Sequence, residues 1–176
     1  MTNKIFTPRF IVLASLIVAA AFARLIPHWP NFTPVAALAL FGGTYINRKH
    51  LAILVPLIAM ILSDIVLGFH NYMFAVYASL LVTVGIGFIV RRKSGILSVA
   101  AGSLVSSVVF FLITNFAVWM MTPAYSSSFS GLLTCYVAGI PFFNNGIMGD
   151  LFFNTILFGS FYAVTSRFPA LQQVKN

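Results

Sequence analysis

Six long apolar stretches, separated by short polar segments, constrain this chain more than any other feature. A helix rises about 1.5 Å per residue and the hydrocarbon core of a bilayer is about 30 Å thick, so one crossing needs roughly 20 apolar residues. Of the 176 residues, 60% are hydrophobic and only 7% are charged. The sequence therefore predicts an all-α integral membrane protein, a single domain over residues 1–176. Its expected spans are residues 10–23, 33–46, 51–68, 72–90, 96–121 and 146–165.

Lysine and arginine are unevenly divided between the two sides of this arrangement. The positive-inside rule places the Lys and Arg of short loops in the cytoplasm. With both termini inside, Arg24 alone lies on the outer side, while a five-span chain with a re-entrant second segment would put Arg48 and Lys49 beside it. Charge therefore favours six spans. The cytoplasmic cations are then Lys4, Arg9, Arg48, Lys49, Arg91, Arg92, Lys93, Arg167 and Lys175.

The net charge of +8 is explained by cations at span ends that face anionic lipid, so we expect no nucleic-acid partner. An alternative concerns the first segment, where Lys4 and Arg9, a short apolar run and Ala21-Phe22-Ala23 resemble a cleavable signal peptide. Cleavage would leave five spans with their sides unchanged. The single cysteine, Cys135, excludes an internal disulfide.

Polar residues of the spans and connections gather on the predicted outer side. Asp64 lies about 20 Å along its helix from the cytoplasmic end, and Asp150 lies at a similar depth in the last span. They are the only two acidic residues, and ionisable groups inside a bilayer are functional candidates by default. The candidate substrate-binding residues are Arg24, His28, Trp29, Asn31, Asp64, His70, Asn71, Asn115, Trp119, Tyr136, Asn144, Asn145 and Asp150.

Structural alternatives exist for these residues. Asp64 and Asp150 could pair with Arg24 and hold the bundle together with no ligand. Tryptophan and tyrosine residues at this level are typical of the aromatic belt of membrane proteins. A site of three histidines would need His50, which is predicted to be cytoplasmic, so no metal site is expected. Cys135 fits a small buried apolar residue, with a soft-metal or cobalt ligand as the alternative.

The connection over residues 122–145 is longer than any other. It starts with the polar "YSSSFSG" and continues with "LLTCYVAGIPFF", an apolar run too short to cross a membrane. Long ordered loops are commonly lids or binding loops. We therefore expect an external lid over the polar cluster, with an interfacial helix that only shields the bundle as the alternative.

Catalytic motifs are absent from the sequence. There is no G-x-x-x-x-G-K-[ST] motif, and Gly85-Ile86-Gly87 lacks the rest of a dinucleotide fingerprint. The "GIMGD" string departs from the G-x-G-D of intramembrane aspartyl proteases, and Ser106 and Ser107 have no histidine at membrane depth. We therefore expect neither an enzyme nor a cofactor.

The strings "PHWPNFTPVAALALFGG", "LSDIVLGFH", "TNFAVW" and "IPFFNNGIMGDLFFN" resemble an uncharacterised family of small bacterial membrane proteins labelled as transport proteins. Six short spans with a polar outer site also resemble the substrate-binding (S) components of energy-coupling factor (ECF) transporters. That resemblance implies a bacterial inner-membrane protein that captures a vitamin-like nutrient outside. It also implies a coupling subunit and ATPases as partners, docked on an A-x-x-x-A face that Ala19 and Ala23 match.

Charge narrows the expected ligand. Arg24 against Asp64 and Asp150 leaves the outer site near −1, which favours a neutral or cationic small molecule with a flat ring for Trp29 or Trp119 to stack on. Two other functions stay open. The chain could be a non-transporting structural or assembly subunit of a membrane complex, or a small ion-coupled transporter that acts alone and titrates Asp64 or Asp150.

Overall fold

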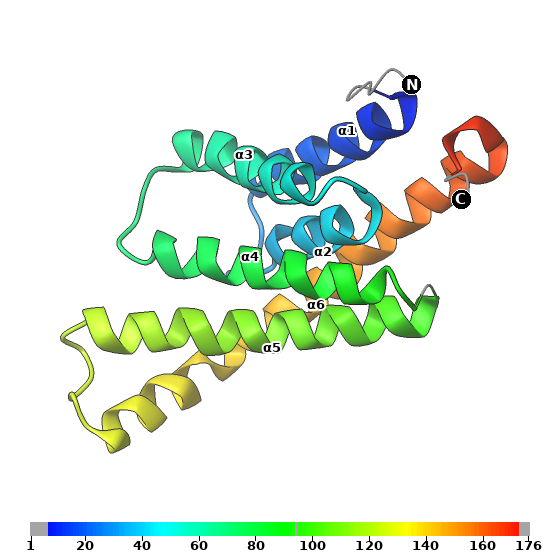
Figure 1. Cartoon of the computed structure of the whole chain (residues 1–176). Coiled ribbons are helices and arrows are strands. Elements are labelled where there is room, and N and C mark those ends of the chain that lie inside the picture. Colours follow the sequence, from blue (N-terminus) through cyan, green and yellow to red (C-terminus); the bar gives the residue numbers. More distant parts are fainter. Residues whose placement is uncertain (1–6, 94, 173–176) are drawn as a thin grey trace.

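The computed structural model describes residues 7–93 and 95–172, and every regular element in that part of the chain is helical, which confirms the all-α prediction (Figure 1). Five of the expected spans match helices to within two residues at each end, whereas the last differs more, because α6 begins 17 residues earlier than expected. The helices are α1 (Pro8–Phe22), α2 (Val35–Tyr45), α3 (Lys49–Leu67), α4 (Met73–Val90), α5 (Ile96–Met121) and α6 (Phe129–Arg167), with short 3-10 turns η1 (Ala23–Leu25) and η2 (Pro169–Leu171).

Polar and glycine residues set several helix ends. Thr7 caps α1, because its Oγ1 accepts a hydrogen bond from the Phe10 N–H at 3.2 Å. Ser128 caps α6 in the same way, accepting from the Gly131 N–H at 3.2 Å. At the end of α3, Gly68 has a φ of +91°, a left-handed conformation that only glycine adopts at little cost.

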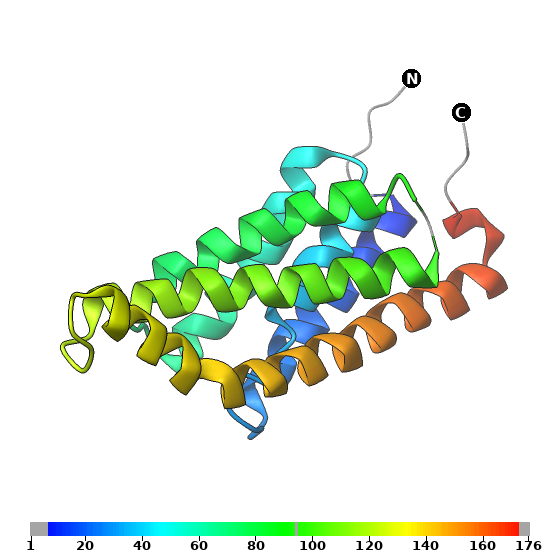
Figure 2. The ribbon, with the colours of Figure 1, turned by 90° about the horizontal axis from the view of Figure 1, so that it is seen from below.

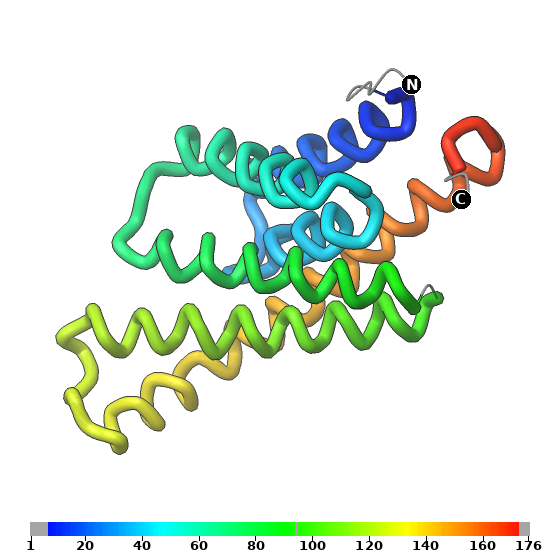
Figure 3. The backbone as a smooth tube through the Cα atoms, in the orientation of Figure 1, coloured from blue at the N-terminus to red at the C-terminus, as the bar shows by residue number. Residues whose placement is uncertain are grey.

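The central helix of the bundle is α2. Its residues 35–44 are all buried, and it packs against α1, α3, α4, α5 and α6 (Figure 3). A helix that is apolar on every side suits a position surrounded by other helices. Its eleven residues extend only about 16 Å, about half of a bilayer core. The helix expected to span over residues 33–46 is therefore short and buried. In the part of the chain that the structure describes, five helices, the first of them extended through η1, are long and apolar enough to cross a membrane.

The backbones of α2 and α4 approach each other closely at two glycines. A Cβ atom on Gly87 would lie 2.7 Å from the Leu40 carbonyl oxygen and 2.8 Å from the Gly43 Cα, and a Cβ on Gly43 would overlap the Val84 carbonyl oxygen. Small residues at such crossings let membrane helices pack backbone to backbone. Any larger side chain at either glycine would push α2 and α4 apart.

The expected external loop over residues 122–145 is wrong, because α6 starts at Phe129 and only residues 122–128 form the connection. The apolar run is helical because it packs along α5: Tyr136 OH donates to the Leu112 carbonyl oxygen at 2.8 Å, and Cys135 is buried. Pro141 lies inside α6, where it cannot donate the helical hydrogen bond to the carbonyl of residue 137. Figure 2 shows α6 bending in this part of the helix.

Arginine contacts bring four helix ends together at one end of the bundle. Arg9 Nη1 donates to the Leu171 carbonyl oxygen at 2.7 Å, which joins the start of α1 to η2. Arg91, which follows α4, donates to carbonyl oxygens at the C-terminal end of α2, including those of Gly43 and Ile46. Arg24 follows α1 and so lies at the opposite end. Of the basic residues discussed above, Lys4 and Lys175 lie outside the described residues.

Candidate functional site

Asp64 forms a buried ion pair with Arg24, which follows the C-terminal end of α1. Arg24 Nη1 lies 2.7 Å from Asp64 Oδ1 and 2.5 Å from the Ser63 Oγ. Tyr77 OH donates to the other carboxylate oxygen, Oδ2, at 2.7 Å. Asp64 is 3% exposed, and both of its oxygens have partners. These contacts tie η1, α3 and α4 together, as the structural alternative for Asp64 requires.

Asp150 lies on α6 in a different environment. It is 6% exposed, and its Oδ2 accepts a hydrogen bond from the Ser107 hydroxyl at 2.7 Å. The backbone N–H of Ala37 is a further favourable electrostatic neighbour of this carboxylate. Across residues 7–93 and 95–172, the pair between Arg24 and Asp64 is the only salt bridge. The single outer cluster that the sequence predicts is therefore split into two sites, and Arg24 pairs with only one of the two acids.

The Ala37 contact places the Asp150 carboxylate at the start of α2. The first N–H groups of a helix have no acceptor within the helix, and Pro34 at the cap position provides no side-chain acceptor. The negative charge of Asp150, on another helix, lies at the positive end of the α2 dipole. A helix end and a hydroxyl therefore hold this carboxylate, with no cation in contact.

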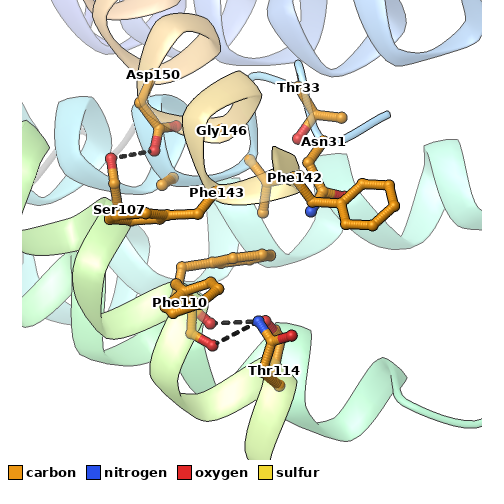
Figure 4. A pocket seen from close by; sticks show the side chains of 13 residues that line it. Asn31, Thr33, Ser107, Phe110, Thr114, Phe142, Phe143, Gly146 and Asp150 are labelled. Atoms are coloured by element: carbon orange, nitrogen blue, oxygen red, sulfur yellow. Dashed lines mark hydrogen bonds between the residues drawn. The ribbon is translucent and has the colours of Figure 1, made fainter. Parts of the chain in front are cut away.

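A cavity of about 60 Å³ lies beside Asp150, between the segment that precedes α2, the middle of α5 and α6 (Figure 4). Asp150 and Ser107 lie at one side of it, and Asn31 and Phe142 at the other. Because Asn31 and Phe142 are exposed, the cavity reaches the surface of the bundle there. Its lining consists of Asn31, Thr33, Val35, Ala36, Ser107, Phe110, Phe111, Thr114, Asn115, Phe142, Phe143, Gly146 and Asp150.

Aromatic rings make up much of this lining. Phe110 and Phe111 come from α5, and Phe142 and Phe143 follow the proline of α6. The rings of Phe111 and Phe143 pack with their centroids 4.6 Å apart. The face of a phenyl ring attracts cations, as does a carboxylate. Together with Asp150, these rings make an environment that favours positive charge.

The segment before α2 is fixed against α6, so it forms one wall of the cavity. Asn31 has a φ of +63°, a left-handed conformation that asparagine tolerates better than most residues. Asn145 Nδ2 donates to the Pro30 carbonyl oxygen at 3.1 Å. The Phe32 ring packs against Phe152 and Phe153, with centroids 5.6 and 5.8 Å away. These contacts hold Asn31 and Thr33 at the cavity.

Of the candidate binding residues, only Asn31, Asn115 and Asp150 line this cavity. Trp29 is 65% exposed and touches Phe32 edge-on. Trp119 donates from Nε1 to the Ser126 carbonyl oxygen at 2.9 Å and so fixes the connection between α5 and α6. Neither tryptophan is placed to stack on a ligand in this cavity. The remaining exposed candidates are His28, His70, Asn71 and Asn144.

The candidate docking residues Ala19 and Ala23 and the candidate metal ligand Cys135 differ in their exposure. Ala19 is exposed on α1, whereas Ala23 is half-buried at the start of η1. Cys135 is buried, and its Sγ contacts the Asn115 carbonyl oxygen at 3.5 Å. In the described ranges, no group of three His, Cys, Asp or Glu residues is arranged to hold a metal ion.

Sequence reasoning missed Ser107 because it treated that residue only as a possible nucleophile. Ser107 and Ser103 lie one helical turn apart on α5, and Asp150 and Asn154 do so on α6. The Asn154 Nδ2 donates to Ser103 Oγ at 2.9 Å, parallel to the contact between Ser107 and Asp150. The spacing of four on both helices was the available signal, because residues at i and i+4 share a helix face.

Comparison with known proteins gives a family and no function. Searches of curated proteins and of solved structures found no significant match. One family model covers residues 4–171, a range that includes all six helices and both acidic residues. By this match, the chain belongs to the family of unknown function DUF6580.

Proposed function

We propose that this protein binds a small neutral or cationic nutrient in the cavity beside Asp150 and carries it across the bacterial inner membrane. The observation that supports the proposal is a buried carboxylate that contacts no cation and lines a cavity reaching the surface. Keeping an ionisable group at membrane depth is costly, so such a residue usually serves a ligand or an ion pathway. Asp64, whose two oxygens are occupied, is structural in this proposal.

The lining favours a cationic ligand within that class. An amine or ammonium group would meet the Asp150 carboxylate and the faces of phenylalanine rings. Thr114 and the two asparagines would hydrogen-bond a neutral polar part of the same molecule. A flat ring stacked on Trp29 or Trp119 is not part of the proposal, because neither residue lines the cavity.

The size of the cavity implies that the structure is a closed form. A cavity of about 60 Å³ is well below the roughly 300–1,000 Å³ of pockets that hold drug-sized ligands. A vitamin-sized nutrient would therefore need the cavity to widen. Phe142 and Phe143 directly follow Pro141, where α6 lacks a hydrogen bond, so the first part of α6 can swing away from α5. This helical segment takes the gating role that a loop was expected to have.

Orientation and partners follow the S-component resemblance. The end that carries Arg9, Arg48 and Arg91 faces the cytoplasm in this proposal, in keeping with the positive-inside rule. Arg24 is then external, because it follows the C-terminal end of α1. A coupling subunit and ATPases would supply energy. The free surface of Ala19 supports docking on α1, whereas the partly covered Ala23 offers little to a partner.

Native mass spectrometry of the gently solubilised protein tests the binding step. We expect a retained small molecule in the wild type and in Asn144→Ala, an exposed control on the same helix as Asp150. Asp150→Asn should lose it. Retention by Asp150→Asn would place the ligand elsewhere. A clean apo mass, with no thermal stabilisation by a panel of small amines, would contradict the proposal and favour an assembly subunit.

The lack of a cation beside Asp150 also favours a second candidate, a small ion-coupled transporter that acts alone. Transport of this kind would need Asp150 as the group that exchanges protons or cations. Liposomes that contain only this protein distinguish the two functions. Uptake driven by a pH gradient and abolished by Asp150→Asn would support the lone transporter, whereas an S component needs its energising partners for uptake.

A further inference from the structure

A second cavity, of about 120 Å³, lies at the opposite end of the bundle from Arg24. The start of α1, the end of α2 and the start of α3 surround it, and Arg9, Tyr45 and Arg48 are among its lining residues. It shares no lining residue with the cavity beside Asp150. An inference about it therefore does not depend on the proposed function.

Arg9 is held in this cavity by contacts that leave part of its guanidinium unsatisfied. Nη1 donates to the Leu171 carbonyl oxygen at 2.7 Å, and the guanidinium carbon lies 5.0 Å from the centroid of the Phe161 ring and 6.0 Å from that of Tyr45. The Nε atom is buried and has no hydrogen-bond partner. A buried donor without an acceptor is unfavourable, and a charged one more so.

Helix ends add to the positive character of the cavity. Both α1 and α3 begin here, and the first N–H groups of a helix carry partial positive charge. No side chain caps the start of α3, which follows directly on Arg48. At the nearby end of α2, by contrast, the carbonyl groups already accept from Arg91, which matches their partial negative charge.

No acidic side chain is among the described residues that line this cavity. The sequence contains two acidic residues, and Asp64 and Asp150 are both committed to the sites described above. The cavity therefore combines two arginines and two helix starts with no carboxylate side chain nearby. A multivalent oxygen anion matches this set, because an arginine fork can hold two oxygens of a phosphate.

We propose that this cavity binds a phosphate group, that of an anionic phospholipid headgroup, with Arg9 and Arg48 as its charged ligands. The cavity is also lined by Leu13 and Leu51, which give the lipid's glycerol and upper acyl carbons an apolar contact. Basic pockets between membrane-spanning helices commonly bind such headgroups. The phosphate would accept hydrogen bonds from the guanidinium groups of Arg9 and Arg48, which line the cavity.

Native mass spectrometry from mixed micelles that contain equal phosphatidylglycerol and phosphatidylcholine tests the site. We expect the wild type to retain phosphatidylglycerol, and Arg9→Gln to lower the retained fraction about tenfold, as loss of a charged hydrogen bond predicts. Arg48→Gln should lower it as well. Arg92→Gln removes the same charge from an exposed position outside the cavity and should retain lipid like the wild type.

Inorganic phosphate, added as a competitor, separates the two sources of the same chemistry. Displacement of the lipid by phosphate, or a phosphate adduct with no lipid preference, would support a phosphate site filled from solution. No phosphate-bearing adduct, or an equal loss in Arg92→Gln, would overturn the proposal. If Arg9→Gln fails to fold by circular dichroism, then full retention by a folded Arg48→Gln would overturn it.

Discussion

Asp64 and Asp150 are both buried within helices long and apolar enough to cross a membrane, yet their neighbours differ completely. Asp64 has a guanidinium on one oxygen and a tyrosine hydroxyl on the other. Asp150 has a serine hydroxyl, the N–H of Ala37 at a helix start and an adjoining cavity. The first carboxylate is saturated by the protein, whereas the second has room beside it for a further partner.

This difference shows that burial alone does not identify a functional acid. A buried ion pair is weak evidence for function, because each charge is needed to compensate the other. Removing one partner destabilises the fold by leaving an uncompensated buried charge, whether or not the pair binds a ligand. A buried carboxylate with no cation has to be stabilised by dipoles, by a ligand or by a proton. Substitutions that remove each partner in turn test whether the two carboxylates have different roles.

The largest effect is expected from Asp64→Ala. The substitution leaves the Arg24 guanidinium buried without its counter-charge, so the free energy of unfolding should fall by about 3–5 kcal/mol. Denaturant unfolding in detergent micelles, followed by circular dichroism, measures the change. The double variant Arg24→Met with Asp64→Leu removes both charges and should recover most of the loss. An unfolding midpoint of Asp64→Ala equal to that of the wild type would refute the structural role.

Tyr77→Phe should have the next largest effect. It removes the hydrogen bond to Asp64 Oδ2 and leaves the ion pair with Arg24 in place, so a loss of about 1.5–3 kcal/mol is expected for a hydrogen bond to a charged group. The same unfolding experiment applies. Tyr162→Phe, a matched removal of an exposed hydroxyl, serves as the control. Equal stability of the two variants would contradict the view that Asp64 is saturated.

Asp150→Asn is expected to affect ligand binding more than folding. The asparagine Oδ1 can still accept from Ser107, and no charge is left without a partner. Affinity for a primary amine should fall about tenfold or more, equivalent to about 1.4 kcal/mol. The decrease in ligand-dependent thermal stabilisation measures it. If Asp150→Asn unfolds as readily as Asp64→Ala, then Asp150 is structural and the comparison fails.

Ser107→Ala is expected to have the smallest effect, about 0.5–1.5 kcal/mol in unfolding free energy. Its single hydroxyl proton has two acceptors in reach, Asp150 Oδ2 at 2.7 Å and the Ser103 carbonyl oxygen at 3.0 Å. Asp150 also keeps the N–H of Ala37. Unfolding measurements on Ser107→Ala and Tyr77→Phe, done side by side, rank the two contacts. A larger loss for Ser107→Ala would reverse the proposed order.

Helix positions were largely predictable from apolar run length. The two departures from expectation, the burial of the short second helix and the helical structure of residues 129–145, have the same physical cause. Residues 33–46 were given the role of a span, and residues 122–145 that of a loop, because sequence periodicity counts apolar residues without showing what covers them. In the structure, α2 is covered by other helices instead of lipid, and the first part of α6 is covered on one side by α5. Tertiary packing decided both segments.

The candidate site was predictable only in part. The location of Asp64 and Asp150 within long apolar helices followed from counting residues, but which acid Arg24 pairs with depends on the rotation of α3 and α6 about their axes. Sequence alone does not give that rotation. The phenylalanine lining was missed for a similar reason, because with 19 phenylalanines in the chain no subset stands out until the helices are packed.

The close approach of Gly43 to Gly87 has a consequence for how the chain is assembled in a membrane. A helix as short as α2 is too short to remain in lipid as a stable span of its own. Its contact with α4 needs residues that the ribosome makes some forty positions later. The centre of this molecule can therefore be completed only after α4 has been made, and substitutions at Gly87 would impair biogenesis of the fold.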